Sequence, residues 1–284
     1  MSIAFVTCTK LPAGSTDDHE AAALLGAEFV IWDDPTVDWN KFDKVIVRSV
    51  WDYTLDRDGF VAWARVLGDK VANQPELLAF NSDKAYLGTL GVPTVPTIFV
   101  VPGAELPTLT GEVVVKPTIS AGGRDTGRFD PDHHGQAREL IAQIHQSGRV
   151  AMVQPYLADV DSVGETAVVF IGGELSHELH KKPVLREQGA AELLDPNDPS
   201  SEAAIMHDDT LVSAAPAGED YLALAEATLA EIAGRFGTPL YARVDMVPSP
   251  AGPVVIEVEA VEPCLYFDLV PGAAQRFAAA VDSL

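Results

Sequence analysis

Residues 113–126 read VVVKPTISAGGRDT, and this stretch decides which kind of fold to expect. Its β-branched run predicts a strand that ends at Lys116, and a loop of small residues with Gly122 and Gly123 follows at once. Glycine allows a phosphate to lie against backbone N–H groups, because no Cβ stands between them. The stretch therefore predicts a nucleotide site, although a strand that leads into an ordinary turn has the same pattern.

The composition of the chain excludes several classes of partner. The 284 residues are 47% hydrophobic and 21% charged, which is typical of a folded protein with two or three subdomains. The net charge of −23 argues against nucleic acid and anionic membrane as partners. Two cysteines are too few for a disulfide framework or a zinc site, and neither a leader peptide nor a membrane span is expected. We expect a cytoplasmic protein.

Short apolar segments alternate with helical ones near the N-terminus. The pattern predicts strands over 3–7, 28–32 and 44–48 and helices over 17–27 and 57–67. Such alternation favours a parallel sheet with crossover helices. Next we expect a linker over 71–80 and a short helix through Leu90. Extended segments interrupted by glycine and proline then lead to the Val113 strand.

The second half of the chain predicts a different arrangement. A helix is expected over 132–146 and a second, alanine-rich helix over 221–236. Gly172-Gly173 predicts a hairpin turn between two of the strands. The strands are expected over 150–154, 166–171, 174–178, 240–247 and 254–258, and loops over 183–216. The chain is therefore predicted to be of the α/β class.

Four charged residues lie on the last two predicted strands. Arg243 is two residues from Asp245, and Glu257 is two residues from Glu259, so each pair shares one face. If the strands form a hairpin, three carboxylates meet beside one guanidinium. Such oxygen ligands favour Mg²⁺ held together with nucleotide phosphates. A half-exposed hairpin whose carboxylates face water gives the same alternation.

Taken in order, these motifs resemble the ATP-grasp superfamily, and within it the glutathione-synthetase-like and RimK-like carboxylate–amine ligases. The resemblance covers nearly the whole chain. It implies a Rossmann-like domain over residues 1–80, a central lid subdomain over 81–158 and a C-terminal subdomain with the metal site over 159–284. The matching residues are Lys84, Lys116 with its loop, Gln154-Pro155-Tyr156-Leu157, Lys181, Arg243, Asp245 and Glu257.

The resemblance also implies roles for these residues in holding ATP and Mg²⁺. Phosphates and adenine would be contacted by Lys84 and Lys116, and the triphosphate would be covered by the lid loop of Ser120, Ala121, Gly122 and Gly123. The adenine hinge would be Gln154, Pro155, Tyr156 and Leu157, and the acidic ribose ligand Glu165. A further nucleotide contact would come from Lys181 or Lys182. Mg²⁺ would be bound by Asp245, Glu257 and Glu259, and the transferred phosphoryl group by Arg243.

Glu259 departs from the asparagine found at this metal position in many relatives. Its E-x-E pattern with Glu262-Pro263, together with Arg48-Ser49-Val50-Trp51-Asp52-Tyr53, resembles the subgroup that closes the cycloserine ring from O-ureidoserine. The resemblance implies that Arg48 and Ser49 meet a small amino-acid-like substrate, with Arg48 on its anionic group and Trp51 as an apolar wall. In the alternative, Arg48 forms a salt bridge and Trp51 packs.

The expected function is that of an ATP- and Mg²⁺-dependent ligase. It would phosphorylate a carboxylate to an acyl-phosphate and join it to an amine, in this subgroup within one O-ureido-D-serine molecule. Arg243 and Lys181 would stabilise the developing charge. The alternatives are an ATP-grasp kinase or phosphotransferase and a non-catalytic ATP-binding regulatory protein. We also expect a homodimer formed through an apolar face of the N-terminal domain.

Overall fold

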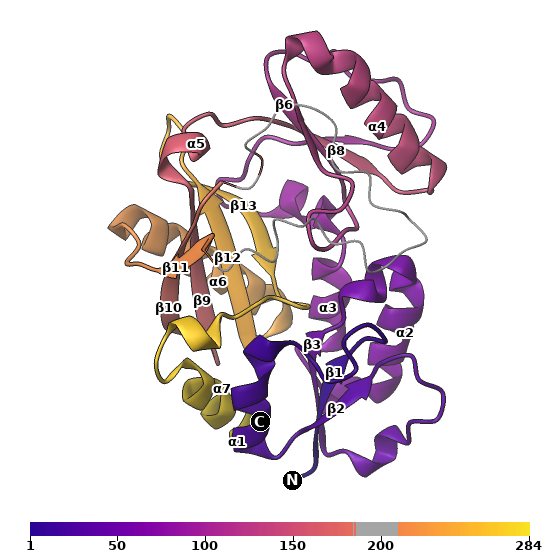
Figure 1. Ribbon diagram of the computed structural model, residues 1–284, viewed down its shortest axis with the longest axis vertical. Helices are drawn as coiled ribbons and strands as arrows, with labels where there is room; N and C mark the ends of the chain where they lie inside the picture. The colour runs from indigo at the N-terminus through magenta and orange to yellow at the C-terminus, as the bar shows by residue number, and fades with distance from the viewer. Residues whose placement is uncertain (184, 186–209) are drawn as a thin grey trace.

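The computed structural model describes residues 1–183, 185 and 210–284, and these form three sheets with helices packed on them (Figure 1). The first sheet has strand order β2-β1-β3-β4, the second β5-β8-β6-β7 and the third β11-β10-β9-β12-β13. Only the first is parallel, and the other two are antiparallel. This mixed architecture confirms the predicted α/β class.

The N-terminal sheet contains β1 (Ile3–Thr7), β2 (Glu28–Ile31), β3 (Lys44–Ser49) and β4 (Val71–Ala72), crossed by α1 (His19–Leu25) and α2 (Arg57–Leu67). The first three strands and both helices confirm the predicted alternation. The linker expected over 71–80 is wrong, because it forms β4 and α3 (Pro75–Asn81). Val71 pairs with Val45, and Leu77 and Leu78 are fully buried, so packing overrides the turn-forming residues.

Short 3-10 helices connect these elements. The short helix expected through Leu90 is present as a 3-10 helix, η5 (Lys84–Thr89), which follows the end of α3. The others are η1 (Thr16–Asp18), η2 (Trp39–Lys41), η3 (Trp51–Leu55), η4 (Gly68–Lys70), η6 (Pro131–His133) and η8 (Phe267–Leu269).

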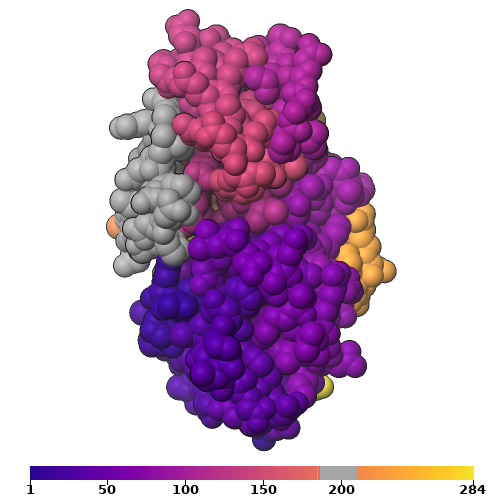
Figure 2. Space-filling model, turned by 90° about the vertical axis from the view of Figure 1, so that its right-hand side faces the viewer, coloured from indigo at the N-terminus to yellow at the C-terminus, as the bar shows by residue number. Residues whose placement is uncertain are grey.

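The second sheet contains β5 (Ile98–Val100), β6 (Val113–Pro117), β7 (Gly127–Phe129) and β8 (Ala151–Pro155). Helix α4 (His134–Gln146) covers one face of this sheet and buries its apolar side against the strands. Ile141 of α4 and Phe129 of β7 belong to the same core cluster. β6 runs antiparallel to β8: Val113 pairs with Pro155 and Lys116 with Met152, so the hinge after β8 lies beside the start of β6 and Lys116 lies near its other end. Figure 2 shows this lobe, coloured magenta to pink, above the violet N-terminal domain.

The third sheet contains β9 (Glu165–Ile171), β10 (Glu174–Lys181), β11 (Val212–Ala214), β12 (Tyr241–Val247) and β13 (Val254–Glu259). The hairpin predicted at Gly172-Gly173 is confirmed, and both glycines have positive φ, 60° and 85°. β11 lies within 183–216, where only loops were expected; residues 184 and 186–209 of that range fall outside the described part. Short α5 (Val160–Val163) and long α6 (Glu219–Phe236) complete this subdomain.

The C-terminal helix α7 (Ala273–Asp282) joins the first sheet to the third. Its Phe277 ring lies 6.1 Å from that of Phe5 on β1 and 6.0 Å from that of Tyr241 on β12. One apolar core therefore continues across the N-terminal sheet and the C-terminal sheet. Within the three described stretches, no helix is both long and apolar enough to cross a bilayer. The domain limits at residues 80 and 158 stay predictions.

Candidate active site

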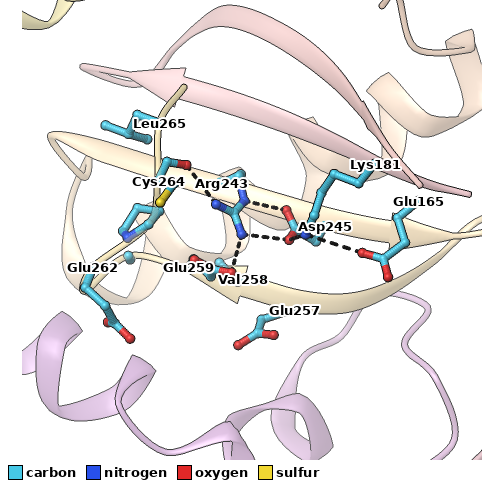
Figure 3. Close-up of polar contacts among 12 residues, drawn as sticks. Glu165, Lys181, Arg243, Asp245, Glu257, Val258, Glu259, Glu262, Cys264 and Leu265 are labelled. Atoms are coloured by element: carbon cyan, nitrogen blue, oxygen red, sulfur yellow. Dashed lines mark hydrogen bonds and ion pairs between the residues drawn. The ribbon is translucent and has the colours of Figure 1, made fainter. Parts of the chain in front are cut away.

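The register of β12 and β13 brings the charged pairs of the C-terminal hairpin together. Arg243 lies opposite Glu259, and Asp245 lies opposite Glu257. The Arg243 guanidinium holds both Asp245 oxygens, at 2.8 and 2.9 Å, and also donates to Glu259 (Figure 3). The predicted hairpin is confirmed, and two of its carboxylates, Asp245 and Glu259, are neutralised by Arg243 on the same sheet instead of facing open water.

Lys181 enters the same cluster from β10. Its Nζ lies 2.8 Å from an Asp245 oxygen and 3.4 Å from Glu165 on β9. Burial alone would raise the pKa of Asp245, but Arg243 and Lys181 outweigh it and hold that pKa well below its usual range. The side chain of Lys182 is exposed, so of the two lysines considered it is Lys181 that joins the cluster.

Lys84 links the loop after β6 to β13. Its backbone N–H donates to Thr118 at 2.7 Å, its Nζ donates to the carbonyl of Ser120 at 2.6 Å, and the same Nζ lies 3.1 Å from Glu257. Lys116 is 9% exposed beside this group. Burial and Lys84 lower its pKa, against an opposing effect of Glu257. Two lysines predicted to contact ATP thus lie near one carboxylate.

The predicted lid loop contains three residues with positive φ. Gly122 and Gly123 have φ of 63° and 68°, which favours glycine, and Asp125 shares this left-handed conformation with φ of 55°. Arg149 holds Asp125 at 2.5 Å, while Ser120 is buried and Ala121 partly exposed. Successive N–H groups in such conformations form concave anion sites.

The segment after β8 is fixed by an ionic network that the motifs did not reveal. Arg128 on β7 pairs with Glu112 at 2.7 Å and with Asp161 on α5 at 2.9 Å, and its guanidinium lies 3.5 Å from the centroid of the Tyr156 ring. Tyr156 donates its hydroxyl to Asp161 at 2.6 Å. The scarcity of basic residues in this acidic chain is the signal that could have identified Arg128.

The other hinge residues take different positions. The Gln154 side chain is buried and donates to Thr97 at 2.8 Å. Pro155 is exposed and Leu157 is partly buried. The structure therefore places the four hinge residues at the end of β8, an inner strand of the second sheet. Their contacts with adenine stay predictions.

Arg48 has the partner that the alternative interpretation assigned to it. It is 2% exposed, and its Nε lies 2.7 Å from Asp18 while Nη2 donates to the carbonyl of Pro263 at 3.0 Å. Ser49 donates to the other Asp18 oxygen at 2.8 Å, and the Trp51 indole donates to the carbonyl of Glu262. Among the described residues Arg48 Nη1 has no hydrogen-bond partner, but the guanidinium lies 5.0 Å from the centroid of the Tyr241 ring. Substrate contact by these three residues stays a prediction.

Two carboxyls of the cluster have raised pKa values. Burial, with Asp245 and Glu257 nearby, raises the pKa of Glu259 to about 7 despite its bond to Arg243. Burial and Glu259 raise the pKa of Glu262 to about 8, although Lys84 opposes this. Among residues 1–183, 185 and 210–284, no group of three or more acidic, histidine or cysteine side chains is arranged to hold a metal ion.

Comparisons with known proteins identify the chain's relatives. Residues 3–73 match the family model described as D-cycloserine synthetase DcsG, N-terminal domain. The chain is 32% identical over 283 residues to the cycloserine biosynthesis protein DcsG of Streptomyces lavendulae, covering 92% of this chain and 90% of the relative. The crystal structure of D-cycloserine synthetase DcsG matches with a TM-score of 0.86 and 29% identity, covering 100% and 99% of the two chains.

More distant structures share the fold. The D-alanine–D-alanine ligase of Bacillus anthracis complexed with ATP gives a TM-score of 0.64 at 15% identity, over 99% of this chain and 94% of the ligase. These likenesses confirm the predicted resemblance and the predicted class of ATP-dependent carbon–nitrogen ligase. The chain belongs to the DcsG family of ATP-grasp ligases.

Proposed function

We propose that the protein is an O-ureido-D-serine cyclo-ligase that forms D-cycloserine at the expense of ATP. The observation that carries this proposal is the close likeness to DcsG along the chain, together with cations and carboxylates gathered between the second and third sheets. The fold shared with an ATP-bound ligase supports the use of ATP.

In this proposal the chain holds ATP through its two lysines and the glycine loop. Lys84 and Lys116 neutralise phosphate charge, and the N–H groups of residues 120–123 close over the triphosphate. Lys84 would exchange its bond to Glu257 for a phosphate oxygen, because it can satisfy only a few acceptors at once. The hinge of residues 154–157, with Glu165 and Lys181 or Lys182, would position the nucleoside.

The carboxylates fit a Mg²⁺ ion that is bound mainly by phosphate. Glu257 and Glu259 lie on one face of β13, and their side chains are 25% and 26% exposed, so both can offer oxygens to the cleft. Asp245 is only 3% exposed and would reach an ion only after Lys181 or Arg243 released an oxygen. When bound, Mg²⁺ would neutralise charge on the transferred phosphoryl group. These three ligands are proposals.

The chemistry needs positioning and charge neutralisation from the protein. A carboxylate oxygen of the substrate attacks the γ-phosphorus and ADP leaves, which gives an acyl-phosphate. The nitrogen bonded to the substrate's oxygen then attacks the acyl carbon and loses its proton as phosphate leaves. The attached carbamoyl group must depart with water, as carbon dioxide and ammonia. Arg243, which in the structure is bonded to Asp245, would stabilise the charge that develops.

The decisive experiment measures ADP release over a panel of amino acids, small amines and O-ureido-D-serine, followed by mass spectrometry of the product. We expect ADP and D-cycloserine only when ATP, Mg²⁺ and O-ureido-D-serine are all present. A stable phosphorylated product would instead identify a kinase or phosphotransferase. ATP binding without ADP release from any acceptor would identify a regulatory protein.

Two further parts of the proposal concern the oligomeric state of the protein and its location in the cell. A dimer would form through apolar side chains of the N-terminal domain, of which Leu24, Leu55 and Val66 are 51%, 53% and 85% exposed. Light scattering should then give twice the mass of 30.2 kDa. A cytoplasmic location without nucleic-acid or membrane partners agrees with the net charge of −23.

A further inference from the structure

The outer edge of β13 has buried backbone groups that face away from the other strands of its sheet. β13 is the last strand in the order of the third sheet, and on its outer side Val255 forms an isolated bridge to Thr94. Val258 lies between Glu257 and Glu259, the two carboxylates that this strand offers to the cleft (Figure 3). Val258 is 2% exposed, so water cannot satisfy its N–H and carbonyl groups. Other groups of the protein must do so.

Tyr86 and Asn81 supply the missing bonds. The Tyr86 hydroxyl, on η5, accepts from the Val258 N–H at 2.7 Å and donates to the Val258 carbonyl at 2.8 Å. The Asn81 amide, at the end of α3, donates to the same carbonyl at 2.7 Å and accepts from the N–H of Ala260 at 2.7 Å. Both side chains are buried. Their four hydrogen bonds therefore fix the backbone on both sides of Glu259.

The same 3-10 helix also holds the carboxylate of Glu257. Lys84, two residues before Tyr86, lies 3.1 Å from Glu257 and donates to the carbonyl of Ser120. This ion pair would have to open when Lys84 turns to a phosphate of ATP, as the proposed function requires. The hydrogen bonds of the Tyr86 hydroxyl involve only the backbone of β13, which the nucleotide does not need. They can therefore keep this strand in place when the ion pair is lost.

The position of the Tyr86 hydroxyl is itself set by packing. The Tyr86 ring lies 5.4 Å from that of Phe80 and belongs to the same core cluster as Val258. Burial, with Glu257 nearby, raises the pKa of Tyr86 well above its ordinary value, so the hydroxyl keeps the proton that it donates. A ring held by the core and a hydroxyl that stays protonated provide a rigid support for the strand.

We propose that Tyr86 and Asn81 are positioning residues that fix the spacing of the Glu257 and Glu259 carboxylates for a divalent cation. This inference rests on the proposed function and deepens its metal site. Mg²⁺ requires nearly ideal octahedral geometry with oxygens at about 2.0–2.1 Å, whereas Ca²⁺ tolerates irregular sites with oxygens at about 2.3–2.6 Å. A strand that loses its outer support should therefore lose affinity for Mg²⁺ before it loses affinity for Ca²⁺.

The test measures how much a metal ion strengthens nucleotide binding. We would titrate ADP calorimetrically into the wild type and Tyr86→Phe in excess Mg²⁺, in excess Ca²⁺ and in EDTA, without any acceptor substrate. Removing a group that holds a metal ligand in place typically lowers metal affinity about 10- to 100-fold. The strengthening of ADP binding by Mg²⁺ should fall by that factor in Tyr86→Phe, or vanish if the wild-type effect is smaller. The effect of Ca²⁺ and the ADP affinity in EDTA should stay within about twofold of the wild type.

Tyr241→Phe is the matched control for the loss of stability. It also removes a buried hydroxyl that donates to backbone carbonyls, those of Val47 and Val261, but neither adjoins a carboxylate of β13. Both tyrosine variants should unfold at lower urea concentration than the wild type, and only Tyr86→Phe should lose the strengthening by Mg²⁺. Asn81→Leu is similar in size to the wild type and removes the other two bonds to β13. It should act as Tyr86→Phe does, and it replaces that variant if Tyr86→Phe does not fold.

Failure of this inference is distinguishable from failure of the proposed function. An undiminished Mg²⁺ effect in Tyr86→Phe and Asn81→Leu would overturn the positioning role and leave the ligase function standing. An equal loss with Mg²⁺ and Ca²⁺ that Tyr241→Phe shares would show only a destabilised fold, and would also overturn it. A wild type that does not convert O-ureido-D-serine contradicts the proposed substrate, while the ADP titrations still support or overturn the positioning role. No effect of Mg²⁺ on ADP binding by the wild type would contradict the metal site and this inference together.

Discussion

Asp245 and Glu257 are directly opposite on neighbouring strands but differ in burial. The Asp245 side chain is 3% exposed and bonded to Arg243 and Lys181, so it does not face water as in the alternative interpretation of the hairpin. Asp245→Asn should therefore lower the free energy of unfolding by about 3–5 kcal/mol, the range for breaking a buried ion pair. Glu257→Gln, in a partly exposed pair, should lower it by less than about 1 kcal/mol.

Urea denaturation without ATP measures these two effects, and ADP release measures turnover. Both variants should lose turnover if the proposed metal site is right, because each removes a carboxylate from it. Equal stabilities would show that the two cations do not anchor Asp245. Near-normal activity of either variant at limiting Mg²⁺ would remove that residue from the proposed metal ligands.

Glu262 should make the stability of the ligand-free protein depend on pH. Its pKa is about 8 in the folded chain and close to the ordinary 4.5 when unfolded. Between these values the folded state holds a proton that the unfolded state releases, so this residue's contribution to stability falls as pH rises. The advantage of Glu262→Gln over the wild type should grow from pH 5 to pH 8 and then level off. Thermal melts in EDTA across this range test it, and a constant difference would contradict the raised pKa.

At the level of elements, the Arg128 network joins β7 and the start of β6 to α5, across the connection between the second and third sheets. Arg128→Met keeps the bulk of the side chain but removes four charge-assisted bonds to Glu112 and Asp161. Because Tyr156 in the hinge packs on this guanidinium, we expect the KM for ATP to rise about tenfold, with the KM of the acceptor little changed.

Arg65→Met is the matched control for this change. Arg65 makes a bidentate pair with Glu76, at 2.9 and 3.0 Å, but it is exposed and lies on α2, far along the chain from the hinge. Steady-state kinetics with each substrate varied in turn give both KM values. A proportional rise in the two KM values would mean that Arg128 only stabilises the fold.

At the level of the whole molecule, Asn73 connects the N-terminal and C-terminal sheets. Its side chain accepts from Leu240 N at 2.7 Å and donates to the carbonyls of Tyr241 and Ala260, both at 2.8 Å. Asn73→Ala would leave these buried groups unpaired, at about 1–3 kcal/mol each. We expect a loss of roughly 3 kcal/mol or more in unfolding free energy by urea denaturation. The exposed Asn40→Ala should cost little, and comparable stability of the two variants would argue against this connection.

The sequence by itself determined the class of fold, the strand–lysine–glycine stretch and the charged hairpin. Each rests on local periodicity: β-branched runs, residues two apart on a strand, and glycines at positive φ. Only the tertiary structure decided that Asp245 is buried between two cations, that Arg48 pairs with Asp18 and that burial raises the pKa of Glu262. These outcomes depend on contacts between residues far apart in the chain, as in the bond from Arg48 Nη2 to the backbone carbonyl of Pro263, 215 residues away. Motifs can assign a charge to a position, but only packing decides which charges meet.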